Sequence, residues 1–129
     1  MVVLRDDLLR VVLVDEADLP GFVRVIVNAH VKEMSDLDAG ARSHLMRMVL
    51  AAEEAVREVL TPLKMNLASL GNVVPHVHWH VIPRFADDAF YPQAIWGTRQ
   101  RDTRPDVLAA RRALLPALQV RLQERIDRL

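Results

Sequence analysis

Three of the chain's five histidines stand at every second position, at His76, His78 and His80, in the segment VVPHVHWHVIPR. Alternate residues of a β-strand point to the same face, about 6.6 to 6.8 Å apart, so this spacing predicts three imidazoles on one surface. Imidazole can act as nucleophile, acid or base near neutral pH, and several on one strand can share these roles at one phosphorus atom. The segment therefore predicts a face that acts on a phosphate group.

The central histidine of such a strand has a neighbour on each side. Its ring can attack with one nitrogen while a backbone carbonyl holds the other as N–H, and a flanking ring can protonate the leaving group. Flanking imidazoles and backbone amides can stabilise charge on the non-bridging oxygens. Three functionless surface histidines are the simpler alternative, but polar side chains inside an apolar strand are costly to bury without a purpose.

Metal binding is the stronger alternative, because alternating histidines on a strand can ligate zinc, iron or copper. The strand supplies no Asp or Glu ligand, and the nearest downstream carboxylates are Asp87 and Asp88. We therefore expect no metal site and no cofactor in the protein. A metal-dependent hydrolase built on the same strand stays open as an alternative function.

Composition excludes several classes of protein. The 129 residues are 51% hydrophobic and 26% charged, with 17 Lys and Arg against 17 Asp and Glu, so a real core and no net charge are expected. Zero net charge argues against a nucleic-acid clamp or a membrane-surface binder. The absence of cysteine excludes disulfides and thiolate catalysis, and charges near the N-terminus argue against a signal peptide or membrane span. We expect a cytoplasmic protein.

Apolar periodicity predicts the elements that position the histidines. Four strands are expected, at 8–14, 22–27, 64–69 and 76–82. A helix begins near Asp38, buries an apolar stripe and ends at Pro62, and a final helix runs from Asp106, kinked or divided by Pro116. This order predicts an α+β fold, a small mainly antiparallel sheet with one central helix and a C-terminal helix. We expect a single domain over 1–129.

The segment His76-Val77-His78-Trp79-His80-Val81-Ile82 resembles the signature of the histidine triad (HIT) family, in which three histidines alternate with apolar residues and two further apolar residues follow. The resemblance spans roughly residues 8–85 and includes the turn Pro20-Gly21, whereas 86–129 resembles a family-variable loop and helix. It implies a small α+β domain that forms a homodimer through its central helix and sheet edge. It also implies a purine nucleotide substrate, attacked at the α-phosphate.

The same resemblance implies a role for each histidine. His78 is the nucleophile that forms a nucleotidyl-histidine intermediate, which water then hydrolyses. His80 contacts the α-phosphate and the leaving-group side. The carbonyl and ring of His76 orient His78.

Other positions resemble the family's substrate contacts. Asp15 resembles its ribose ligand, Asn66 an amide side chain that precedes the triad, and Asn72 a polar phosphate contact; each is also a residue type found in turns. Two departures stand out. Phe22 replaces a fourth histidine that many members carry after the Pro-Gly turn, and Val73 lies where some branches have a phosphate-contacting hydroxyl.

Arg84 and Trp96 remain without a fixed role. Arg84 suits either a distal phosphate or a surface ion pair with Asp87 or Asp88, and Trp96 is expected to pack locally. We expect a hydrolase or transferase that cleaves a nucleoside phosphoramidate or dinucleoside polyphosphate at the α-phosphate. A metal-dependent hydrolase and a catalytically weakened nucleotide-binding protein, the latter suggested by Phe22, are the alternatives.

Overall fold

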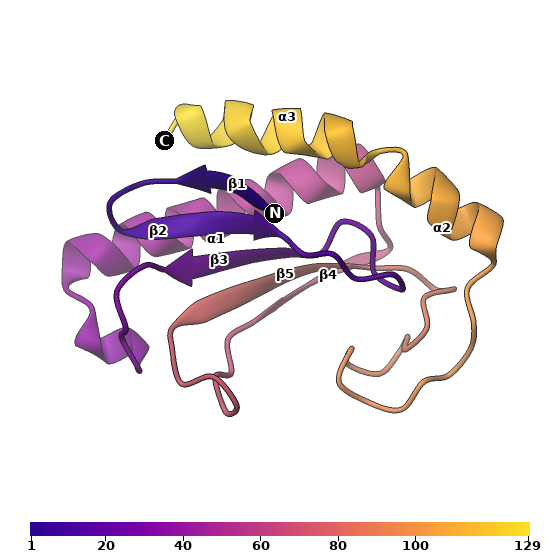
Figure 1. Ribbon diagram of the computed structural model, residues 1–129, viewed down its shortest axis with the longest axis horizontal. Helices are drawn as coiled ribbons and strands as arrows, with labels where there is room; N and C mark the ends of the chain where they lie inside the picture. Colours follow the sequence, from indigo (N-terminus) through magenta and orange to yellow (C-terminus); the bar gives the residue numbers. More distant parts are fainter.

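The computed structural model describes residues 1–129 and is organised around a five-stranded sheet (Figure 1). The strands are β1 Val2–Arg5, β2 Leu9–Leu13, β3 Val23–Val27, β4 Lys64–Ala68 and β5 His78–Arg84. They lie in the order β1-β2-β3-β5-β4, and every neighbouring pair is antiparallel. The predicted α+β fold with an antiparallel sheet is confirmed.

The first strand, β1, was not expected from the sequence. It has four residues, and its pairing with β2 shifts register between Val2 and Leu4. Its burial does not alternate, because both middle residues are partly buried and both ends are exposed. A strand this short and irregular leaves little periodicity in the sequence.

Helix α1, Ala39–Leu60, covers one face of the sheet. Asp38 caps it by accepting a hydrogen bond from the Ala41 amide, and Thr61 ends it in the left-handed conformation, directly before Pro62. The helix therefore begins and ends where the sequence predicts.

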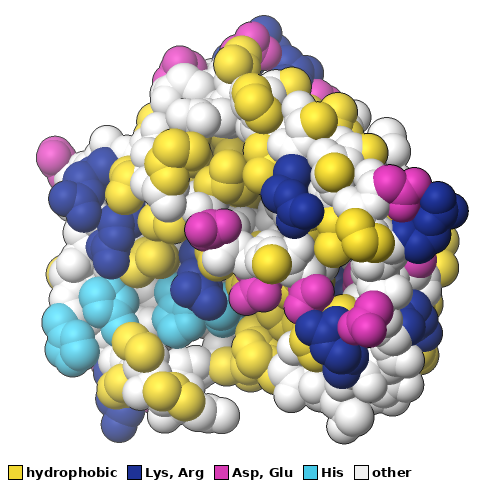
Figure 2. All heavy atoms as spheres, turned by 45° about the vertical axis from the view of Figure 1, so that its right-hand side comes forward, with side chains coloured by type: hydrophobic (Ala, Val, Ile, Leu, Met, Phe, Trp, Pro, Cys, Tyr) yellow, Lys and Arg dark blue, Asp and Glu magenta, His cyan; other side chains and the backbone are white.

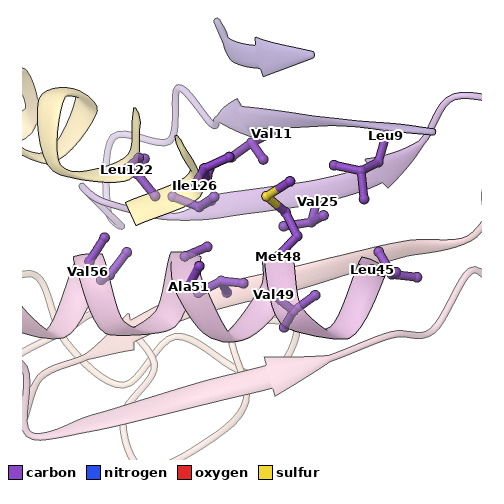
Figure 3. Close-up of a cluster of buried hydrophobic side chains, with 14 of the residues drawn as sticks. Leu9, Val11, Val25, Leu45, Met48, Val49, Ala51, Val56, Leu122 and Ile126 are labelled. Carbon is purple, nitrogen blue, oxygen red and sulfur yellow. The ribbon is translucent and has the colours of Figure 1, made fainter. Parts of the chain in front are cut away.

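The core lies between this helix, the sheet and the C-terminal helix (Figure 3). Met48 and Ala51 of α1 point toward the sheet, where Val11 and Val25 are fully buried. Each fully buried side chain of this size stabilises the fold by about 1.5 to 3 kcal/mol.

The C-terminal part divides into α2, Pro105–Arg112, and α3, Leu115–Asp127, with Pro116 in the first turn of α3. The predicted division of the final helix is confirmed. Helix α3 packs on α1 and β1, and residues 85–104 form neither helix nor strand. A short 3-10 helix, Met34–Asp36, precedes α1. No helix combines the length and the apolar character needed to cross a membrane.

The sheet face opposite α1 carries the histidines. Arg24 of β3 lies directly opposite His80 of β5, and Ile26 lies opposite His78, so these four side chains share a face. We call it the open face. Trp79 and Val81 of β5 point toward α1 and the core, as expected.

Candidate active site

The histidine strand begins two residues later than predicted. The expected range was 76–82, whereas β5 runs from His78 to Arg84. Val77 donates to the Val31 carbonyl and accepts from the Val27 amide, so its main chain bonds to the last residue of β3 and to a residue beyond it rather than to a regular ladder. His76 therefore stands just outside the strand.

The strand also continues through Pro83, which was expected to end it. The Arg84 carbonyl accepts from the Leu63 amide on the β4 side, so the nitrogen of Pro83 faces the opposite side. Strand β3 does not extend that far, because it begins at Val23, which pairs with Val81. A proline costs no ladder bond at a position without a neighbour.

His78 is held in one tautomer by the main chain. Its Nδ1 lies 2.5 Å from the carbonyl oxygen of His76. Because a carbonyl oxygen only accepts, Nδ1 carries the proton, and Nε2 keeps the lone pair that a nucleophile needs.

His80 is buried among aromatic rings, and its side chain is only 5% exposed. Its ring centroid lies 4.9 Å from that of His78, 5.6 Å from Phe22 and 5.0 Å from Trp96. Burial, followed by the charges of His78 and Arg24, lowers the pKa of His80 to about 4. His80 is therefore neutral at physiological pH.

Arg24 fixes the tautomer of that neutral ring. Its Nε donates to His80 Nδ1 over 3.4 Å. Since a guanidinium only donates, Nδ1 accepts and Nε2 carries the proton. The Nε2–H of His80 is thus a hydrogen-bond donor for a substrate oxygen. A pKa near 4 favours this hydrogen-bond donor role over the protonation of a leaving group that the sequence suggested for a flanking ring.

The ring of His76 lies away from the other two. Its Nε2 contacts the carbonyl oxygen of Val27, and its centroid lies 5.4 Å from that of His30. It does not line the cleft described next. The expectation of three rings on one surface therefore holds for two, while His76 contributes the carbonyl that orients His78.

A cleft of about 390 Å³ opens beside His78 and His80. Its lining consists of Arg24, Leu70, Gly71, Asn72, Val73, Val74, His78, His80 and Trp96. Figure 2 shows the histidines gathered on one part of the surface, next to hydrophobic and basic side chains. Asn72 is exposed at this cleft, so the structure brings it together with both histidines.

The other two predicted substrate contacts lie outside this lining. Asp15 is exposed just after β2. Asn66 lies on the open face opposite Ile82, but its side-chain oxygen accepts a hydrogen bond from Arg84 at 2.8 Å. The structure thus ties Asn66 to the interior instead of to the two histidines.

Arg84 forms the expected ion pair with Asp88, but in the interior and not at the surface. It is 2% exposed and forms an ion pair with Asp88, whose carboxylate lies 2.9 Å from Nε. A second nitrogen, Nη2, donates to the Gln93 carbonyl. All three nitrogens of this buried side chain are bonded within the protein, so Arg84 organises the segment that follows β5 instead of facing a phosphate.

Trp96 reaches the site from that segment. It is half exposed, and its ring packs edge-on against His80. The segment is fastened by Arg99, which contacts Asp18 at 2.5 Å, and by Arg101, which donates to the Asp88 carbonyl. Trp96 was expected to pack locally, and its partner is a catalytic candidate from a distant strand.

No three His, Asp or Glu side chains converge in a way that could hold a metal ion. A catalytic zinc site takes three protein ligands. The chain does not supply such a set around His78 and His80.

Comparison with known proteins identifies relatives of the same architecture. A histidine triad protein from Bradyrhizobium japonicum superposes with a TM-score of 0.77 and 25% sequence identity, over 98% of this chain and 90% of the other. The AP-4-A phosphorylase of Mycobacterium tuberculosis is 30% identical over 96 residues, which are 66% of this chain and 49% of that protein. An asymmetrical bis(5'-nucleosyl)-tetraphosphatase of Schizosaccharomyces pombe is 32% identical over 71 residues, 51% of this chain and 39% of the other.

This chain spans about half the length of the curated relatives it matches. The family model described as HIT domain matches residues 1–87, which hold helix α1 and all five strands, including the histidine strand β5. Sequence motif, sheet topology and family match therefore agree, and the chain belongs to the HIT domain family.

Proposed function

We propose that the protein is a nucleotide hydrolase or transferase that cleaves dinucleoside polyphosphates or nucleoside phosphoramidates at the α-phosphate. The observation that carries the proposal is the fixed tautomer of His78, whose protonated Nδ1 leaves Nε2 free at the cleft. The names of the two curated relatives, a phosphorylase and a tetraphosphatase of dinucleoside polyphosphates, support the substrate class.

In the proposed reaction, His78 Nε2 attacks the α-phosphorus. The new N–P bond forms as the bond to the leaving group breaks, and the leaving group departs with the electron pair. The His76 carbonyl stabilises the positive charge that this step places on the imidazole. Water then attacks phosphorus, the electron pair of the N–P bond returns to His78 Nε2, the proton that water loses passes to solvent, and nucleoside monophosphate is released.

His80 and Asn72 hold the phosphate in this scheme. The Nε2–H of neutral His80 donates to a non-bridging oxygen, and the Asn72 side chain lies at the same cleft. Removing one such donor in other enzymes costs about 100- to 1,000-fold in rate. Asp15 and Asn66 are proposed ribose and substrate contacts that require movement of the side chain or of the substrate to reach the cleft.

The test is chromatographic detection of AMP released from diadenosine tetraphosphate and from adenosine 5'-phosphoramidate. We expect turnover in the presence of a chelator, and a loss of roughly a thousandfold or more in His78→Ala. His30→Ala is the control, because His30 is exposed outside the cleft. No release by the wild type favours the nucleotide-binding alternative, and release abolished by chelator favours the metal-dependent one.

We also propose that two copies pair along the β4 edge. Strand β4 is the last of the sheet, so its outer main chain is unpaired, and the adjacent Leu63 and Leu67 are 62% and 37% exposed. Light scattering should report twice the 14.6 kDa chain mass. The variant Leu63→Lys with Leu67→Lys should report one chain mass, whereas Val120→Lys, an equally exposed apolar position on α3, should not.

A further inference from the structure

Arg24 is the one permanently charged side chain of the histidine cleft. No Lys, Asp or Glu lines that cleft, and Arg24 forms no ion pair with any carboxylate of the chain. It is half-buried on β3 and is held from two sides. Its Nε donates to His80, and its guanidinium lies 5.2 Å from the centroid of the Phe22 ring. The side chain therefore presents a fixed, uncompensated positive charge to the cleft.

The donors that Arg24 has left are the ones suited to a phosphate. A guanidinium has five N–H donors, and Arg24 uses only Nε within the protein, so both Nη groups are free. Arg84 is the contrast, because all of its nitrogens are bonded to Asp88, Asn66 and the Gln93 carbonyl. A planar guanidinium with two free Nη groups matches two oxygens of one phosphate.

The cleft also lacks a group that protonates a leaving group at neutral pH. His80 is neutral there, its pKa being lowered to about 4, and His78 Nδ1 donates to a carbonyl. No carboxylic acid or lysine lines the cleft. An amine leaving group requires a proton as its P–N bond breaks, whereas a phosphate oxygen can depart as an anion.

We propose that Arg24 binds the phosphate of a polyphosphate leaving group, next to the α-phosphate that His78 attacks. The bridging P–O bond breaks, its electron pair stays on the departing phosphate oxygen, and the Arg24 guanidinium pairs with that anion. Among the substrates considered above, this selects dinucleoside polyphosphates over phosphoramidates. The inference rests on the proposed function, since it assumes attack by His78.

The test compares kcat/KM for diadenosine tetraphosphate and adenosine 5'-phosphoramidate in wild type, Arg24→Gln and Arg24→Lys. We expect Arg24→Gln to lower the value for the tetraphosphate about 100-fold and the value for the phosphoramidate less than tenfold. Arg24→Lys should recover part of the loss on the tetraphosphate, because it keeps the charge. Arg10→Gln is the control, since Arg10 contacts Asn28, directly after β3, and lies outside the cleft. Circular dichroism checks that each variant folds.

Equal losses on the two substrates, or a wild type that prefers the phosphoramidate, would overturn the proposal, because Arg24 would then act only through His80. A binding measurement separates this outcome from failure of the catalytic scheme. In calorimetry, Arg24→Gln should bind ADP about tenfold more weakly than the wild type does, and AMP less than threefold more weakly. If the wild type releases no AMP from either substrate, the proposed function fails, and the comparison of ADP with AMP still decides the role of Arg24. An equal loss of affinity for ADP and AMP in Arg24→Gln would contradict the proposed role of Arg24.

Discussion

Replacing Asp88 with alanine tests whether one buried carboxylate holds the segment that places Trp96 beside His80. The Asp88 carboxylate accepts from Arg84 Nε at 2.9 Å and from Nη2 at 3.1 Å. It also accepts from the amides of Phe85, Phe90 and Tyr91, at 2.8 to 3.0 Å. These five hydrogen bonds join the end of β5 to the start of the loop.

The expected cost follows from burial. Arg84 and Asp88 side chains are each 2% exposed, so removing the carboxylate leaves a buried cation without its partner. Breaking a buried pair in this way costs about 3 to 5 kcal/mol. A domain of this size has about 5 to 15 kcal/mol of stability in total. We therefore expect Asp88→Ala to lower the free energy of unfolding by a fifth or more and Tm by roughly 10 to 20 °C.

Urea denaturation followed by circular dichroism measures the loss. Asp87→Ala is the matched control, because Asp87 is 50% exposed and its carboxylate has one ion-pair partner, Arg111. An exposed pair contributes about 1 kcal/mol or less. Acrylamide quenching of tryptophan fluorescence reports on the loop itself, and we expect it to increase in Asp88→Ala as Trp96 becomes more accessible.

The same pair predicts a dependence on pH. Burial by itself raises the pKa of Asp88, but hydrogen bonds from Arg84 and from main-chain amides outweigh it and hold the pKa below 3.8. The stabilisation is therefore complete above about pH 4 and is lost as the pH falls further. The difference in free energy of unfolding between wild type and Asp88→Ala should therefore be smaller at pH 3 than at pH 7. Equal losses in Asp88→Ala and Asp87→Ala at pH 7 would refute the reasoning.

Four further changes test other parts of the structure. The pKa of His80 is lowered from 6.5 to about 4, so stability should fall by about 3 kcal/mol between pH 6.5 and 4, and His80→Gln should lack this slope in urea titrations. Trp96→Ala should expose His80 and raise its pKa toward the ordinary value, which NMR titration of the ring can follow. Gly21→Ala should destabilise by about 1 to 3 kcal/mol, since φ is +90° and the new Cβ lies 2.5 Å from a Leu60 methyl. Gly40→Ala, in the first turn of α1 where the new Cβ meets only an Asp38 oxygen at 3.5 Å, should gain up to about 1 kcal/mol in thermal melts.

The parts of the fold that sequence predicts well are those with a regular apolar period. The stripe on α1 and the alternation in β2, β3 and β5 each repeat often enough to identify the element and its buried face. Strand β1 is too short and irregular to show a period, and the two-residue shift at the start of β5 depends on main-chain partners far along the chain. The bonds of Val77 to Val27 and Val31 leave no local pattern.

The residues of the candidate site fall into the same two groups, those with a local sequence pattern and those without one. His78 and His80 follow from their spacing, because the face they share is a property of one strand. Arg24 was missed because its partner is 56 residues away, and only the register of β3 with β5 brings the two side chains together. Within its own strand, Arg24 is simply the one charged residue of an apolar run. That single charge was the available signal.

Phe22 bears on whether this protein has kept a working site. The absence of a histidine at that position suggested a missing orienting hydrogen bond and a weakened enzyme. In the structure His80 receives a hydrogen bond from Arg24, two residues further along the same strand face, while the Phe22 ring packs against His80 and supports the guanidinium. Arg24 therefore supplies His80 with an orienting hydrogen bond that Phe22 cannot make. The missing histidine is thus a weak argument for the binding-protein alternative. The residue that orients His80 here is a cation, Arg24, at the cleft where the departing phosphate is proposed to lie.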